Sequence, residues 1–106
     1  MMIDTDRMSE LEAEIGADDL TFIVALFLGE AEEAIAEIAG GLADDAHARA
    51  THFLRSGALN IGLTGFAEAA DAAAAVAAPL RAATAGPLST ALDETRVALG
   101  QPAIAA

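Results

Sequence analysis

The sequence predicts an all-α protein, an antiparallel up-and-down four-helix bundle with a short additional N-terminal helix. Three observations favour this fold. Alanine, the strongest intrinsic helix former, is the most abundant residue, while Trp and Tyr are absent. Apolar residues recur at helical spacing through the long segments of the chain. The breaks between these segments are short, and short connections favour antiparallel neighbours.

Length and composition exclude several classes of protein. The 106 residues suffice for one domain with a single core. Because cysteine is absent, the chain has no disulfide, thiol catalyst or cysteine metal site. A net charge of −12 argues against nucleic-acid binding, which requires clustered Lys and Arg. No apolar run approaches the roughly 20 residues of a membrane helix, and no basic leader precedes an apolar segment, so we expect a cytoplasmic protein.

The first helix is predicted over about residues 5–15. Asp4 or Thr5 is placed to cap its start, and Gly16 is placed to end it. Its apolar residues Met8, Leu11 and Ile15 share one face. A helix this short is expected to pack across the end of the bundle.

The second helix is predicted over about 18–39, with an acidic first turn that suits a helix N-terminus and a Gly-Gly pair after its end. Phe22 and Leu26 project to a different side from the core, where they lie either beneath the first helix or in an exposed apolar patch. The predicted core stripe consists of Leu20, Ile23, Phe27, Ala31, Ala34, Ile38 and Leu42.

The third helix is predicted over about 44–61, and its two faces differ in character. The inward positions are Ala46, Ala50, Phe53, Leu54, Gly57 and Ile61. The outward positions are Asp45, Ala48, Arg49, His52, Arg55, Ser56 and Leu59. His52 is therefore expected on the solvent side.

The fourth helix is predicted over about 64–84, with Pro79 producing a kink or a helix end. Gly86 and Pro87 then separate a last helix over about 88–99, and the chain end over 100–106 is expected to fray. The predicted inward positions of the fourth helix are Phe66, Ala69, Ala70, Ala73, Val76, Ala77 and Leu80.

The run from His52 to Leu63, HFLRSGALNIGL, lies on the third predicted helix and resembles the signature of histidine-containing phosphotransfer domains. That signature has a His, any residue, an aliphatic residue, Lys, Gly and two small residues, then often Asn and an aliphatic residue before Gly. The positions that match are Leu54, Ala58, Asn60, Ile61 and Gly62. The positions that depart from it are Arg55, Ser56 and Gly57, in place of Lys, Gly and a Ser or Ala.

The resemblance implies that His52 carries a phosphoryl group between receiver domains in a multistep two-component phosphorelay. The expected partners are response-regulator receiver domains, with a hybrid histidine kinase as a further candidate, and the chain itself is expected to be monomeric. The receiver would supply the aspartates and Mg²⁺ that perform the transfer. This chain has no nucleotide-binding loop, so we expect no bound cofactor or metal and no enzymatic activity of its own.

The residues around His52 suit this role chemically. A neutral imidazole is a good nucleophile, and its phosphoramidate can pass the phosphoryl group onward. Arg55, one turn later on the same face, and Arg49, three residues earlier, are placed to offset the phosphoryl charge. Ser56 and Gly57 keep the surroundings small so that a partner can approach.

Four apolar residues are predicted to form a docking collar around His52, with Leu59 as its anchor. The others are Ala48 and, from the second helix, Leu26 and Phe22. Asn60 and Gly62 are expected to be structural, through the turn after the third helix and through close packing or a local bend.

His47 lies roughly 140° from His52 around the helix, at the rim of the core, and is also expected to be structural. An alternative function remains open on the sequence. The protein could be a helical adaptor that binds a receiver or kinase domain without being phosphorylated.

Overall fold

The computed structural model describes residues 2–100, and all regular structure in this range is helical, as predicted. The elements are α1 (Thr5–Ile15), α2 (Ala17–Ala39), α3 (Asp44–Ile61), α4 (Thr64–Ala74), a 3-10 helix η1 (Arg81–Thr84) and α5 (Ala85–Ala98). Within the described range, none of these helices combines the length and apolar content needed to cross a membrane. The part of the C-terminal segment that follows Gly100, which was predicted to fray, lies outside the described residues.

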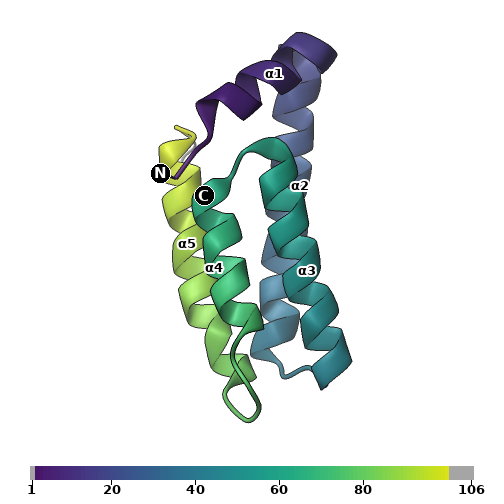
Figure 1. Cartoon of the computed structure of the whole chain (residues 1–106), viewed down its shortest axis with the longest axis vertical. Helices are drawn as coiled ribbons and strands as arrows, with labels where there is room; N and C mark the ends of the chain where they lie inside the picture. The colour runs from purple at the N-terminus through teal and green to yellow at the C-terminus, as the bar shows by residue number, and fades with distance from the viewer. Residues whose placement is uncertain (1, 101–106) are drawn as a thin grey trace.

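The four helices α2 to α5 run along the long dimension of the molecule, and α1 crosses one end of this group (Figure 1). Each of the four packs on two others: α2 and α4 both lie against α3 and α5. α1 contacts α2 and α3, as expected for a short helix across the end. α3 therefore has one neighbour on each side, and its remaining side faces solvent.

α1 is tied to the end of α3 by the residues around Gly62. Gly62 ends α3 in the left-handed conformation, with φ 86°. The backbone N–H of Asp4 donates to the Gly62 carbonyl at 2.8 Å, and a Cβ on residue 62 would lie 2.9 Å from the Asp4 carbonyl oxygen. Arg7 donates to the backbone carbonyl of Asn60 at 2.9 Å and to its side-chain oxygen at 3.4 Å. In this structure, Asn60 and Gly62 hold α1 in place.

α2 buries a wide face because it packs on α3 and α5 at once. Ile23 is 38% exposed, so its place in the predicted core stripe is wrong, and Leu20 and Leu42 are only half-buried. The predicted positions that are buried are Phe27, Ala31, Ala34 and Ile38. The face is completed by three buried residues outside the predicted stripe, Val24, Leu28 and Ile35.

The buried line of α3 is rotated from the predicted line. Phe53, predicted inward, is 39% exposed. Leu54 and Ile61 are buried as predicted, and the buried line as a whole lies nearer to α4 than predicted because α3 packs more extensively on α4 than on α2. The buried residues of α3 are His47, Thr51, Leu54, Ala58 and Ile61, whereas Ala46, Ala50 and Gly57 are half-buried.

Of the two outcomes predicted at Pro79, a kink or a helix end, a helix end is observed, but the predicted bound at residue 84 is wrong because α4 ends at Ala74. Pro79 explains why the helix does not continue through this segment. Proline has no N–H to donate, and its ring would clash with the carbonyl of residue 75 in a continuous helix. The residue before a proline is also driven out of the helical region. The connection over 75–80 therefore contains three predicted inward residues, Val76, Ala77 and Leu80, and Leu80 is 64% exposed.

α5 begins at Ala85, three residues earlier than predicted. Gly86 and Pro87, predicted to separate two helices, lie in the first turn of α5. Proline is tolerated there because the first N–H groups of a helix have no partner within it.

Candidate functional site

His52 lies in the middle of α3 on the side that faces solvent. The buried residues Leu54 and Ala58 fix the rotation of the helix and so direct His52 outward. This part of the helical-wheel prediction is confirmed, since all the predicted outward residues are exposed: Asp45, Ala48, Arg49, His52, Arg55, Ser56 and Leu59. The imidazole of His52 is accessible to a partner protein.

A hollow of about 280 Å³ lies beside His52, between α3 and α4. Arg55 and Asp71 both line it, and Arg55 Nε lies 3.5 Å from Asp71 Oδ1. The two side chains are 49% and 72% exposed. An ion pair this exposed contributes less than about 1 kcal/mol, so Arg55 is oriented by Asp71 without being locked to it. The remaining lining residues are Ala48, Thr51 and Ala74.

Ser56 and Gly57, predicted to leave room for a partner, have different surroundings. The Ser56 hydroxyl donates to the His52 carbonyl at 2.8 Å, so its proton is used within the helix. Gly57 faces α2, where a Cβ would lie only 2.5 Å from Cε1 of Phe27. The small size of Gly57 admits the Phe27 ring into the interface between α2 and α3, and it opens no space on the His52 face.

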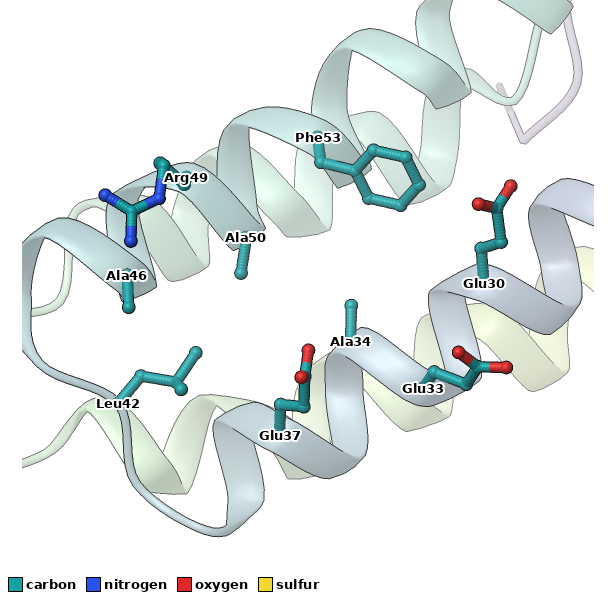
Figure 2. Close-up of a pocket in the computed structure, with 9 residues that line it drawn as sticks. All are labelled: Glu30, Glu33, Ala34, Glu37, Leu42, Ala46, Arg49, Ala50 and Phe53. Atoms are coloured by element: carbon teal, nitrogen blue, oxygen red, sulfur yellow. The ribbon is translucent and has the colours of Figure 1, made fainter.

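Arg49 lines a different groove from His52. This groove, of about 420 Å³, lies between α2 and α3 (Figure 2). Arg49 Nη1 lies 3.2 Å from Asp45 Oδ2, and this hydrogen bond, together with one from the Ala46 N–H, lowers the pKa of Asp45. The cation that lines the His52 hollow is Arg55. The opposite wall of the groove carries Glu30, Glu33 and Glu37.

The four predicted docking residues lie on two helices. Leu59 is 42% exposed and lines a second hollow of about 160 Å³, which Arg55 and Asp71 also line. Ala48 lines the His52 hollow itself. On α2, Phe22 is 67% exposed and Leu26 52%, so of the two placements open on the sequence, the exposed patch is the one observed.

Asp71 is the residue of the site that the sequence analysis missed. It lies on α4, in a run of alanines, and no motif includes it. The sequence nevertheless contains a signal that places Asp71 near Arg55. If two antiparallel helices meet at a turn, residues equally far from the turn lie opposite each other, and Arg55 and Asp71 are equally far from Leu63.

His47 is buried, with 2% of its surface exposed, and lies deeper than the predicted rim position. Its Nε2 lies 3.5 Å from Thr84 Oγ1. The Thr84 hydroxyl donates to the Arg81 carbonyl at 2.6 Å, so toward His47 it can only accept. Burial, and secondarily the charge of Arg81, lower the pKa of His47. These contacts make His47 part of the packing between α3 and η1.

Among residues 2–100, no group of three or more His, Cys, Asp or Glu side chains is arranged to hold a metal ion. Comparisons of the chain with protein-family models, with curated proteins and with solved structures gave no match. The function of this chain is therefore inferred from the site and from the sequence motif that runs through it.

Proposed function

We propose that this protein is a phosphocarrier in a multistep two-component phosphorelay and that His52 accepts and donates the phosphoryl group. The observation that carries the proposal is an exposed histidine in the middle of α3 beside a hollow that Arg55 also lines. The resemblance of the segment from His52 to Leu63 to histidine-containing phosphotransfer domains gives independent support.

In the proposed reaction, a neutral ring nitrogen of His52 attacks the phosphorus of an aspartyl phosphate on a receiver domain. An N–P bond forms, the bond from phosphorus to the carboxylate oxygen breaks, and its electron pair stays on the carboxylate. The other ring nitrogen releases its proton to solvent. The reverse reaction passes the phosphoryl group to the next receiver. The receiver supplies Mg²⁺ and the carboxylates around it, so this chain acts as a carrier and not as an enzyme.

The proposed scaffold is an antiparallel up-and-down four-helix bundle of α2 to α5, with α1 across one end. The packing of these helices in a ring, each against the one before and the one after, supports this arrangement. The proposed setting is the cytoplasm, with the protein acting as a monomer. A receiver would dock over Leu59 and Ala48, with Leu26 and Phe22 toward the edge, because exposed apolar patches mark interaction sites.

The proposal is tested by mixing the chain with phosphorylated receiver domains from the same organism and following transfer of the label. Wild type is expected to gain an acid-labile, alkali-stable phosphate, and His52→Gln is expected to gain none while keeping its helicity. His47→Gln, with folding verified by circular dichroism, should be labelled like wild type. Full labelling of His52→Gln would exclude His52 as the acceptor. Binding of a receiver without any transfer would favour the adaptor function instead.

A further inference from the structure

Asp71 is an acidic residue that lines the hollow beside His52. It belongs to α4, yet its side chain lines the same hollow as His52 and lies 3.5 Å from the Arg55 guanidinium. Arg55 thus has two possible acceptors in one hollow, the Asp71 carboxylate and a phosphoryl group on His52. The hollow is open to solvent, and no buried contact holds Arg55 to either of them.

The two acceptors differ in charge. A phosphoryl group carries about two negative charges and three acceptor oxygens, whereas a carboxylate carries one charge and two oxygens. Because the existing pair is exposed and therefore weak, Arg55 can exchange from the carboxylate to the phosphoryl group. After this exchange, Asp71 has lost its cation, so the phosphorylated state lacks the attraction between Asp71 and Arg55 that the unphosphorylated state keeps, and its free energy is higher by that amount.

We propose that Asp71 sets how readily phosphohistidine 52 gives up its phosphoryl group, by competing with that group for Arg55. This inference rests on the proposed function. Asp71 is a positioning residue, since it acts on the phosphoryl group through Arg55. Before His52 is phosphorylated, Asp71 directs the Arg55 guanidinium into the hollow. After His52 is phosphorylated, Asp71 weakens the hold of Arg55 on the phosphoryl group, so that the group passes on to a receiver.

A test that needs no partner protein uses phosphoramidate as the phosphoryl donor. A ring nitrogen of His52 attacks the phosphorus of phosphoramidate in its zwitterionic form, whose nitrogen carries three protons. The P–N bond breaks, and ammonia leaves with the electron pair. The ammonia then takes the proton released by the imidazole and becomes ammonium. At a fixed ratio of phosphoramidate to ammonium, ³¹P NMR of the full chain gives the ratio of phosphorylated to free His52.

We expect Asp71→Asn to raise this ratio by roughly two- to fivefold, the scale of one exposed ion pair lost on phosphorylation. Asp71→Glu restores the charge and is expected to return the ratio toward that of wild type. Glu68→Gln is the matched control, because it removes one charge from the same helix, and Glu68 lines the neighbouring hollow together with Arg55. The ratio for Glu68→Gln should lie closer to the wild-type ratio than the ratio for Asp71→Asn does.

The role of Arg55 is isolated by repeating Asp71→Asn in an Arg55→Ala background. If Asp71 acts by competing for Arg55, its substitution has a much smaller effect there. An effect of the same size in both backgrounds would overturn the inference, as would equal ratios for Asp71→Asn and wild type. A wild-type chain that phosphoramidate does not phosphorylate on His52 would overturn the proposed function and, with it, this inference.

Discussion

Substitution of two glycines by alanine tests the packing of α2 against α3. Gly57 and Gly29 both lie inside helices, and neither has a positive φ. At Gly57 a Cβ would lie 2.5 Å from Cε1 and 2.9 Å from Cδ1 of Phe27, whereas at Gly29 it would meet nothing within 4 Å. Because alanine is favoured over glycine in a helix by about 0.8–1.0 kcal/mol, both substitutions gain the same intrinsic term and differ in the space available.

The Phe27 ring cannot simply move away from an added methyl group. Its side chain is 7% exposed, and its ring centroid lies 6.0 Å from that of Phe53 and 6.1 Å from that of Phe66. Forcing an extra methyl group into a packed interface costs about 1–3 kcal/mol. After the helical gain is subtracted, Gly57→Ala should destabilise the protein by up to about 2 kcal/mol. Gly29→Ala should stabilise it by about 0.5–1 kcal/mol.

Urea denaturation followed by far-UV circular dichroism measures both free energies of unfolding. Repeating Gly57→Ala in a Phe27→Leu background provides a check on the cause, because leucine lacks the ring atoms that the new methyl group meets. The cost of Gly57→Ala should then be smaller than in the wild-type background. If Gly57→Ala is as stable as Gly29→Ala, the close approach of Phe27 to the backbone of α3 is incorrect.

Two further predictions concern His47 and Leu59. Because burial lowers the pKa of His47 below its unfolded value, the unfolded chain binds the proton more readily, so stability should fall as the pH drops below about 6.5. Urea titrations between about pH 7 and pH 5 should show a weaker pH dependence for His47→Leu than for wild type, and parallel curves would contradict this. Leu59→Asp should weaken receiver binding by about 1–2 kcal/mol in calorimetric titrations without loss of helicity. An unchanged affinity would place the docking surface elsewhere, and an unfolded variant would place Leu59 in the core.

The sequence predicted the ends of a helix correctly where a local signal, such as a capping residue or a glycine, marks them. The bounds of α1 and α3 match the prediction, because Asp4 caps α1 through its side chain, and Gly16 and Gly62 each take a positive φ after a helix end. Pro79 was predicted to kink or end the fourth helix, but the sequence around Pro79 does not show how far upstream of it the helix ends. In the structure α4 stops five residues before it, at Ala74.

The rotation of α3 could not be predicted in the same way, because it depends on which neighbouring helix buries more of its surface. His47 and Thr51 occupy the buried line, and polar residues there weaken the apolar periodicity that a helical wheel detects. Phe53 therefore seemed a better core residue than its 39% exposure shows. The error did not affect His52, since the outward face is wide enough to remain exposed after the rotation.

The structure separates the motif from His52 to Leu63 into two groups of residues. Leu54, Ala58 and Ile61 are buried, Gly57 admits Phe27, and Gly62 admits the backbone that leads into α1. A helical protein without any phosphotransfer activity would need these residues just as much, because they serve the packing of α3. The part of the motif that the proposed function requires is much smaller and consists of His52 and Arg55, with Leu59 as the predicted docking anchor. The resemblance is therefore tested most sharply by substitutions at His52 and Arg55, where loss of phosphate uptake cannot be attributed to loss of the fold.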